Sequence, residues 1–447
     1  MIFYFLFFIL IFPPVISFLL FSIMFYQEKE WTAFRKSSGI GIMFLFSAWI
    51  IYAIHFDLLL YIGIGFEIFL MILFLIPFKN RSNIIDDRPE KRFDERDIMF
   101  SRRELIPGSE RYNSYYKAHP ELEKVDNLFR DEPGLLSKDS AYYNKKAFEK
   151  AGKYFEEIKD LSPLITGNLN SLKSRTNPID LSIQVKRLGK ELGALDVGIA
   201  QVMPYHFYSV KGRGIDYGNK IEIRHNFAIA FTVEMDYEMV MAAPKASIVM
   251  ESARQYLNSG KIAVKIAEYI RKMGYDARAH IDGNYQVICP LVARDAGLGE
   301  LGRMGLLMTP GHGPRVRIGV VTTDIELIPD PYVKRDSVFD FCMMCKKCAE
   351  CCPGNSIPHG NPKMIDGARR WKINSESCFT FWCKAGTDCG RCMSVCPYSH
   401  RNNIIHNLVR KEIDRSSLFR YAALKLDDFF YGKKPLPKPL PADLQEE

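Results

Sequence analysis

The sequence predicts an α+β fold that follows three N-terminal transmembrane helices and leads into a small cysteine-rich domain. Three observations carry this prediction. The first 78 of the 447 residues hold long apolar stretches, a middle region alternates helix-like and strand-like patterns, and ten of the eleven cysteines fall between 342 and 396. The chain is long enough for one large or two ordinary globular domains beside the N-terminal segment.

Apolar stretches in the region 1–80 predict transmembrane helices near 2–26, 38–54 and 58–78. A cleaved secretory signal is the alternative for the first stretch, but this stretch lacks a basic start and a small-residue cleavage site. Lysines and arginines occur in the loop after the first span and directly after the third span. The positive-inside rule therefore predicts a multi-pass protein of the cell membrane, in contact with lipid, with its large C-terminal part on the cytoplasmic side.

The net charge of +8 does not by itself indicate a nucleic-acid partner. The basic residues from 79 to 103 are interleaved with acidic ones, and no recognition motif accompanies them. A surface that faces a membrane explains the excess more simply. We therefore expect no nucleic-acid partner.

Two polar regions lie outside the predicted core. Residues 81–160 are rich in tyrosine and charge and predict a connecting segment with short helices and no chemistry of its own. Residues 421–447 end in a proline-rich stretch and predict a mobile C-terminal tail.

Regular periodicity marks residues 161–335 as an α+β core. Apolar residues recur at helical spacing from 179 to about Gly193, and again from 247 to about Gly274. The run 226–235 is apolar and suits a buried strand, and the sequence RVRIGVVTTDIEL reads as another strand. This alternation predicts helices packed on a sheet.

The first cysteine group, FCMMCKKCAECCP, contains the spacing C-x2-C-x2-C-x3-C-P. Cys342, Cys345, Cys348 and Cys352 stand before Pro353 in this order. This is the ferredoxin pattern, in which three closely spaced thiolates bind one [4Fe-4S] cluster and the fourth reaches a second cluster. An odd cysteine count and a large core argue against a disulfide framework.

The second group, DCGRCMSVCP, is a shortened version that lacks its first cysteine. Gly386 occupies that position, so a further thiolate must come from upstream, where either Cys378 or Cys383 could serve. The pattern predicts a ferredoxin-like domain over 336–420 with two [4Fe-4S] clusters, one on Cys342, Cys345, Cys348 and Cys396 and one on Cys352, Cys389, Cys392 and Cys378. Two zinc sites are the alternative, but zinc does not require the three-cysteine run followed twice by Cys-Pro.

A glycine-rich segment, 282–327, precedes the cysteines. Its glycines interrupt an apolar stretch, as happens where backbone approaches a large flat ligand. The letters GLGELG match G-x-G-x-x-G, but no strand-then-helix unit with a downstream acid surrounds them, so a nucleotide site is not indicated. A loop-rich crossing of the core is the structural alternative. Because two neighbouring clusters deliver electrons, this segment is the candidate site of the acceptor.

Three motifs together resemble the corrinoid-dependent reductive dehalogenase family: AGLGELGRMGLLMTPGHGPRVR, then FCMMCKKCAECCP, then CFTFWCKAGTDCGRCMSVCPYSH. The likeness extends upstream and covers roughly 90–405. Epoxyqueuosine reductase is a more distant relative. The resemblance implies a nitroreductase-like α/β domain over 161–335 that binds a cobalamin-type corrinoid, next to the two-cluster domain. It also implies reductive removal of halide from an organohalide.

The same resemblance implies a tyrosine as proton donor, with a basic residue that stabilises its phenolate. The segment EMDYEMVMAAP resembles the one that carries this tyrosine, which makes Tyr237 the first candidate and Arg303 its cationic partner. Tyr275 is the second candidate and Asp282 the third. The alternative for Tyr237 is a core tyrosine without chemistry.

Typical members of the family carry a twin-arginine signal, which this sequence does not show. The electron donor stays open between the quinone pool, a ferredoxin and a flavoprotein. Two other functions also stay open. One is a corrinoid reductase that acts on a non-halogenated substrate, as epoxyqueuosine reductase does, and the other is a membrane-bound iron-sulfur electron-transfer protein without a corrinoid.

Overall fold

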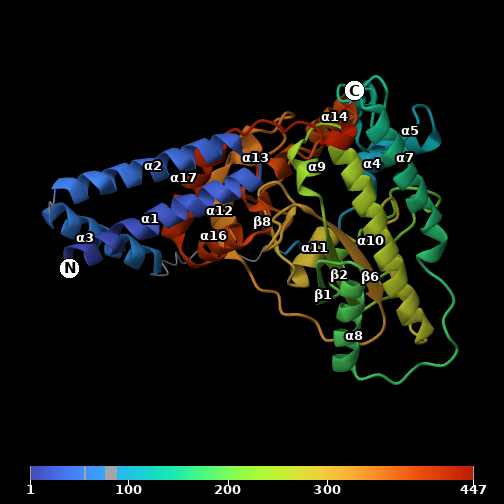
Figure 1. The fold of residues 1–447 in the computed structure, drawn as a ribbon. Helices are drawn as coiled ribbons and strands as arrows, with labels where there is room; N and C mark the ends of the chain where they lie inside the picture. The colour runs from blue at the N-terminus through green and yellow to red at the C-terminus, as the bar shows by residue number, and fades with distance from the viewer. Residues whose placement is uncertain (1, 55–56, 76–87, 446–447) are drawn as a thin grey trace. The chain divides into compact units, whose positions relative to one another are not determined.

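A computed structural model describes residues 2–54, 57–75 and 88–445 (Figure 1). The chain divides into two compact units, of which the first comprises Met1–Ser82 and Arg401–Pro435 and the second Asn83–His400 and Leu436–Glu447. The end of the third predicted span, 76–78, and the predicted boundary between 80 and 81 lie outside the described residues.

The first unit is helical. Its N-terminal helices are α1 (Ile2–Gln27), α2 (Trp31–Ile54) and α3 (Asp57–Leu75), and its C-terminal helices are α16 (Ile404–Arg415) and α17 (Ser417–Tyr431). Met24, Phe25 and Ala33 form a small core with Phe430, and the rings of Phe25 and Phe430 lie 5.0 Å apart between centroids. Segments from the two ends of the chain therefore share one core.

The prediction of three transmembrane helices, and with it that of a multi-pass membrane protein in contact with lipid, is wrong. Helices do form at the predicted places, but in the stretches 2–54, 57–75 and 88–445 none is both long and apolar enough to cross a bilayer. Some apolar side chains of α1 form a protein core instead: Met24 and Phe25 are buried against Phe430 of α17.

The second unit is built on a four-stranded sheet in the order β1-β2-β6-β3, with each neighbouring pair antiparallel. These strands are β1 (Asp196–Gln201), β2 (Phe227–Glu234), β3 (Ala277–His280) and β6 (Val316–Thr323). Two short hairpins complete the strands, β4 (Glu300–Leu301) with β5 (Leu307–Met308) and β7 (Lys363–Ile365) with β8 (Ala368–Arg370).

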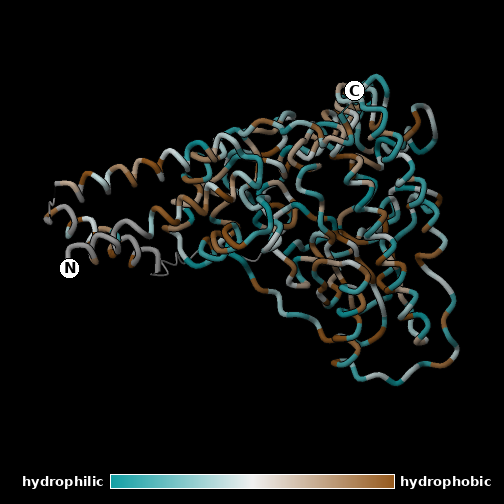
Figure 2. The backbone as a smooth tube through the Cα atoms, viewed as in Figure 1, coloured by the Kyte–Doolittle hydropathy of each residue, from teal (hydrophilic) through white to brown (hydrophobic). Residues whose placement is uncertain are grey.

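Alternating side chains of the sheet face two helical layers. Ile229, Phe231 and Val233 of β2 belong to the core under α8 (Pro178–Glu191) and α10 (Ser247–Lys272). Ala228 and Ala230 belong to the other core, under α11 (Cys289–Asp295). Figure 2 shows hydrophobic residues concentrated where the sheet meets these helices. The period of two along β2 thus produces a three-layer α/β/α arrangement.

The remaining elements of the second unit are short. The helices are α4 (Met99–Arg103), α5 (Glu110–Ala118), α6 (Pro120–Arg130), α7 (Lys145–Asp160), α9 (Tyr237–Met241), α12 (Asp336–Cys345), α13 (Lys347–Glu350), α14 (Ser375–Ala385) and α15 (Arg391–Ser394). The 3₁₀ turns are η1 (Glu95–Asp97), η2 (Ser162–Leu164), η3 (Pro204–His206), η4 (Pro397–Ser399) and η5 (Ala442–Leu444).

Several local predictions are confirmed. The strand expected at 226–235 is β2, and the strand expected after Arg315 is β6. Helices α8 and α10 end just before Gly193 and Gly274, whose φ angles of 106° and 84° are the left-handed values that a glycine adopts without strain.

The C-terminal tail differs from the prediction of a mobile extension. The backbone N–H of Lys438 donates to Met241 O at 3.0 Å, and Asn144 Nδ2 donates to Leu444 O at 3.1 Å. Leu444 is 1% exposed and packs in the core of α7 and α10. The proline-rich segment is therefore fixed to the second unit by one buried leucine and by backbone hydrogen bonds.

Candidate active site

The structure brings Cys342, Cys345, Cys348 and Cys396 together. Cys342 and Cys345 lie at the end of α12 and Cys348 lies on α13, separated by Lys346 in a left-handed conformation with φ 56°. Burial raises the pKa of Cys396 well above its usual value, and the three other thiols raise it further because they lie beside it.

A second set consists of Cys352, Cys378, Cys389 and Cys392. Burial raises the pKa of Cys392 to about 12, with further contributions from Cys378 and Cys352. Cys389 has Cys392 and Cys378 as neighbours. Cys378 lies near Cys352, whereas Cys383 is buried against Phe129 and Phe379. The assignment of these eight thiols to two clusters stays a prediction.

Backbone N–H groups point at the sulfur atoms of both sets. Ser356 N donates to Cys352 Sγ at 3.2 Å, and Cys396 and Cys389 accept backbone hydrogen bonds from Tyr398 and Arg391. Such donors stabilise thiolate charge. Across the described ranges, no three His, Cys, Asp or Glu side chains are grouped closely enough to hold a single metal ion. The four thiolates of a [4Fe-4S] cluster bind four different iron atoms.

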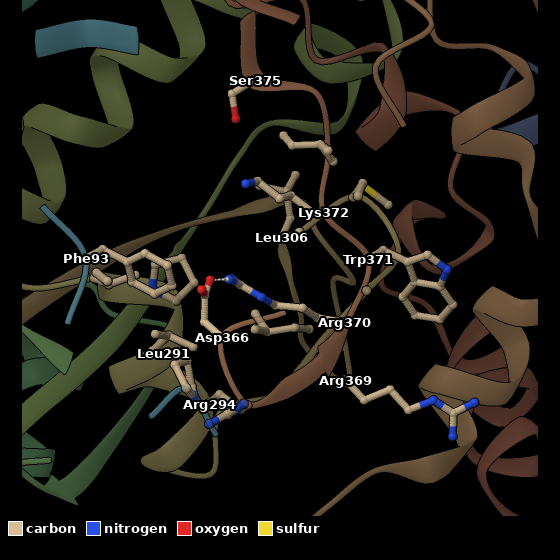
Figure 3. A pocket seen from close by; sticks show the side chains of 18 of the residues that line it. Phe93, Leu291, Arg294, Leu306, Asp366, Arg369, Arg370, Trp371, Lys372 and Ser375 are labelled. Atoms are coloured by element: carbon tan, nitrogen blue, oxygen red, sulfur yellow. Dashed lines mark hydrogen bonds and ion pairs between the residues drawn. The ribbon is translucent and has the colours of Figure 1, made fainter. Parts of the chain in front are cut away.

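The larger of two adjoining cavities, with a volume of about 620 Å³, lies against the glycine-rich segment (Figure 3). Its wall includes Gly302, Gly305 and Leu306, together with side chains of the β7–β8 region. Figure 3 shows Asp366 and Arg370, which form an ion pair of 2.7 Å. Gly305 has φ 76°, and nothing lies within 4 Å of the position that its Cβ would take. Backbone is therefore exposed on this wall.

The smaller cavity, of about 450 Å³, shares part of its wall with the larger one. The residues that line both are Ile98, Met99, Tyr208, Ile288, Pro290 and Leu306. The remaining wall includes the aromatic side chains Phe100, Phe155, Tyr256, Tyr285 and Trp382. Its charged residues are Arg213, Asp282, Arg317 and Asp388. The segment 81–160, predicted only to connect, supplies Met99 and Phe100 from α4.

Tyr256 and Arg317 form a pair on this wall. Tyr256 comes from α10 and Arg317 from β6, and the guanidinium carbon of Arg317 lies 4.9 Å from the centroid of the tyrosine ring. Burial raises the pKa of Tyr256 to about 12, and the positive charge of Arg317 acts against this rise. A phenol beside a fixed cation is a suitable acid, because the cation stabilises the phenolate that remains after proton transfer.

Asp388 fixes the orientation of Arg317. Arg317 Nη2 donates to Asp388 Oδ2 at 2.9 Å and to Ser252 Oγ at 2.5 Å, and Ser252 Oγ donates to Asp388 Oδ2 at 2.5 Å. Asp388 directly precedes Cys389. The arginine over Tyr256 is thus tied to the loop that carries the second cysteine set.

The structure does not bring Tyr237 and Arg303 together. Arg303 is fully buried beside the first cysteine set, where Nε and Nη2 both donate to Cys342 O at 3.0 Å. The cations over the Tyr237 ring are instead Arg315, at 5.6 Å, and Lys438, at 5.1 Å. Arg303 therefore supports the cysteine loop.

The three candidate acids lie in different surroundings: a core, an exposed position and the smaller cavity. Tyr237 is 6% exposed and packs with Met393 and Leu306, and it is not among the residues that line the smaller cavity. Tyr275 Oη donates to Ser174 O at an exposed position. Asp282 lines the smaller cavity, and burial raises the pKa of its carboxyl.

No sequence motif singles out Tyr256 or Arg317, because each fits a regular pattern. Tyr256 lies within the long helical period of α10, and Arg317 stands in a strand between Val316 and Ile318. Arg317 could have been found as the one charged residue of a largely apolar strand. A charge in such a place requires a partner, which makes it a candidate site residue.

Comparisons with known proteins find similarity to enzymes named as reductive dehalogenases. No family model matches the chain. A curated tetrachloroethene reductive dehalogenase of Desulfitobacterium hafniense is 37% identical over 219 residues, which cover 46% of this chain and 39% of that protein. One of Sulfurospirillum multivorans is 33% identical over 211 residues, covering 45% and 41%. The resemblance to reductive dehalogenases is confirmed.

Solved structures agree with this result. A catabolic reductive dehalogenase matches with a TM-score of 0.64 and 25% identity, covering 80% of this chain and 49% of that one. An epoxyqueuosine reductase of Atelocyanobacterium thalassa is a weaker match, 29% identical over 119 residues, covering 24% of this chain and 36% of that protein. The chain spans about two fifths of the length of the curated reductive dehalogenases above.

Proposed function

We propose that this protein is a reductive dehalogenase, an oxidoreductase that replaces the halogen of an organohalide by hydrogen. The observation that carries the proposal is the Tyr256–Arg317 pair on the wall of an aromatic cavity, next to an exposed glycine backbone and two cysteine sets. The likeness to enzymes named as reductive dehalogenases supports it independently.

Two [4Fe-4S] clusters are the proposed electron carriers, one on Cys342, Cys345, Cys348 and Cys396 and one on Cys352, Cys378, Cys389 and Cys392. Burial of the thiols and the backbone N–H groups aimed at them fit this assignment, since both features tune such clusters. Arg303 would hold the first cysteine loop through Cys342 O.

The larger cavity is the proposed corrinoid site. A flat macrocycle requires a wall of bare backbone, and Gly305 contributes one. An added Cβ at Gly302 would lie 3.0 Å from Met308 Cγ and 3.6 Å from Cys342 Sγ, so this wall is also close to the first cysteine set. When bound, a corrinoid supplies a low-potential cobalt centre for cleavage of the carbon–halogen bond.

Residues of the smaller cavity are the proposed source of the proton that the carbon gains when the halide leaves. In the overall reaction the carbon–halogen bond breaks, the halide leaves, and the carbon gains two electrons and one proton. The hydroxyl of Tyr256 gives that proton, Arg317 stabilises the resulting phenolate, and solvent protonates it again. The aromatic wall excludes water from the reacting carbon.

Asp282 favours a second candidate function. The resemblance to epoxyqueuosine reductase makes an aspartate in this region a possible acid, and Asp282 lines the same cavity as Tyr256. A corrinoid reductase acting on a non-halogenated substrate would use this carboxyl in place of the phenol.

The deciding experiment combines composition with activity. Protein purified from cells supplied with cobalamin is assayed for cobalt, iron and halide release from a panel of organohalides. We expect about one cobalt and about eight iron per chain, as one corrinoid and two [4Fe-4S] clusters imply. Iron without cobalt would contradict the proposal and favour an electron-transfer protein.

Two tyrosine variants then locate the acid. Tyr256→Phe should keep cobalt and iron but lose at least about 100-fold in turnover, the usual contribution of a positioned acid. Tyr237→Phe tests the prediction made from the resemblance, and Tyr421→Phe, an exposed position of α17, is the control. Full turnover in Tyr256→Phe would overturn the assignment.

A further inference from the structure

We infer that Asp388 is a positioning residue through which the second cysteine set and the Tyr256–Arg317 pair act on each other electrostatically. Electron arrival at the cysteine set then controls proton release from the tyrosine. This inference rests on the proposed function, because it takes a cluster on the second set and Tyr256 as the acid.

Asp388 stands between the two sites. It directly precedes Cys389, a member of the second set, and it also lines the smaller cavity. Its Oδ2 accepts from Arg317 Nη2 at 2.9 Å and from Ser252 Oγ at 2.5 Å. One carboxylate therefore adjoins a proposed cluster ligand and also holds the cation that lies over Tyr256.

The loop that carries Asp388 is held by its own hydrogen bonds. Thr387 Oγ1 donates to Pro244 O at 2.8 Å and accepts from the backbone N–H of Cys389 at 3.2 Å. The backbone N–H of Gly390 donates to Asp388 O at 2.7 Å. Because Thr387 is fully buried, these bonds fix the carboxylate relative to Cys389.

Burial makes the charges of this site effective. The side chains of Arg317 and Asp388 are 13% and 9% exposed, so little water screens them. Burial raises the pKa of Tyr256 to about 12, and the charge of Asp388 contributes to this rise. Burial also raises the pKa of Cys389 well above its usual value, and Asp388 contributes there as well. The charge of Asp388 thus acts on both sites.

This arrangement sets the order of the two transfers. An electron on the second cluster adds negative charge beside Asp388 and disfavours the phenolate of Tyr256, so the phenol keeps its proton. Once the electrons have passed on to the carbon, Arg317 again stabilises the phenolate and the proton is released. Because such a coupling is reciprocal, Arg317 must raise the reduction potential of the second cluster and Asp388 must lower it.

The potentials of both clusters are measured by redox titration followed by EPR, on protein purified with its cofactors. Cys378→Ser, which should retain only the first cluster, assigns the two transitions. Arg317→Gln removes the positive charge, Asp388→Asn removes the negative charge, the double variant removes both, and Arg317→Lys keeps both. The controls are Tyr256→Phe, which alters the same cavity without removing a charge, and Arg224→Gln, whose side chain is 75% exposed.

We expect the two single variants to shift the second cluster in opposite directions. At a fixed potential, the ratio of reduced to oxidised cluster should fall on the order of 10-fold in Arg317→Gln and rise on the order of 10-fold in Asp388→Asn. A unit charge about 10 Å away implies this size at an effective dielectric constant of about 20. The double variant, Arg317→Lys and both controls should stay within about 3-fold of the unmodified protein.

Shifts of both single variants in the same direction would indicate a general disturbance and overturn the inference, as would the absence of a shift in either. Asp388→Asn leaves the Arg317 charge buried without its partner, which is strongly destabilising. If that variant does not fold, Arg317→Gln and Arg317→Lys decide the question, and an equal change in both overturns the inference.

The two proposals fail in different ways. If the second cluster shifts as expected but no organohalide of the panel releases halide, the proposed function fails while the electrostatic link stands. If halide is released but the charge variants leave the second cluster unchanged, the dehalogenase function stands and the inference about Asp388 fails.

Discussion

Replacing Arg317 by glutamine tests the proposed proton donor through its partner. The substitution removes the cation over Tyr256 but keeps a side chain that can donate a hydrogen bond to Asp388. Because a phenolate would then form beside Asp388 without a compensating positive charge, the phenol becomes a weaker acid. We expect lower turnover with the cofactors still in place.

The size of the effect follows from the distance between the two groups. The guanidinium carbon of Arg317 lies 4.9 Å from the ring centroid of Tyr256. Unit charges about 5 Å apart interact by about 3 kcal/mol at an effective dielectric constant of about 20. This equals about two pKa units of the phenol. Depending on how much of this energy is present in the transition state, turnover should fall about 10- to 100-fold.

The assay is halide release under saturating reductant, normalised to the cobalt content of each preparation. Arg317→Lys should recover most of the turnover, because it restores the charge, and Arg254→Gln, at a half-exposed arginine of α10, serves as control. Turnover of Arg317→Gln within about 3-fold of the unmodified protein, with cobalt and iron intact, would refute the role of the Tyr256–Arg317 pair.

Three further predictions concern the cysteines, acid stability and the glycine-rich segment. Cys378→Ser should lower iron from about eight to about four per chain, while Cys383→Ser should leave iron unchanged, as iron analysis would show. Burial acts against ionisation of Asp295, but His206 and other partners lower its pKa from 3.8 to about 2. Its ionised form therefore adds about 2 kcal/mol of stability above about pH 4, which is lost as the pH falls towards 2, and thermal unfolding of Asp295→Asn should lack this loss. Gly299→Ala should lower both melting temperature and cobalt content, because its Cβ would lie 2.4 Å from a backbone oxygen.

The choice between two cysteines for the second set shows what the spacing of residues along the sequence cannot determine. Cys378 and Cys383 both lie on α14, and the pattern alone allows either. Five residues correspond to about 500° of rotation, so the two side chains point in different directions from the helix. The structure turns Cys378 towards Cys352 and Cys392, and it buries Cys383 against Phe129. Helix orientation, which depends on packing, therefore favours Cys378, and the iron content of Cys378→Ser and Cys383→Ser tests this prediction.

The N-terminal segment shows a related limit. Its apolar composition determined that helices form, and α1 (Ile2–Gln27) matches the predicted span 2–26, whereas α2 begins at Trp31, before the predicted position 38. Composition does not determine what an apolar helix packs against. Burial of Phe25 against Phe430, a residue from the other end of the chain, is a tertiary contact that no local pattern contains.

The sequence by itself determined the features that depend only on residues close together along the chain. These are the cysteine spacing, the glycine-rich segment, the period of two in β2 and the helix ends at Gly193 and Gly274. Only the tertiary structure decided which side chains meet in the smaller cavity. Arg317 reaches Tyr256 because β6 lies in the sheet that α10 covers, and Arg303 reaches Cys342 instead of Tyr237. A site assembled from distant elements depends on their packing, and packing is set by the whole core.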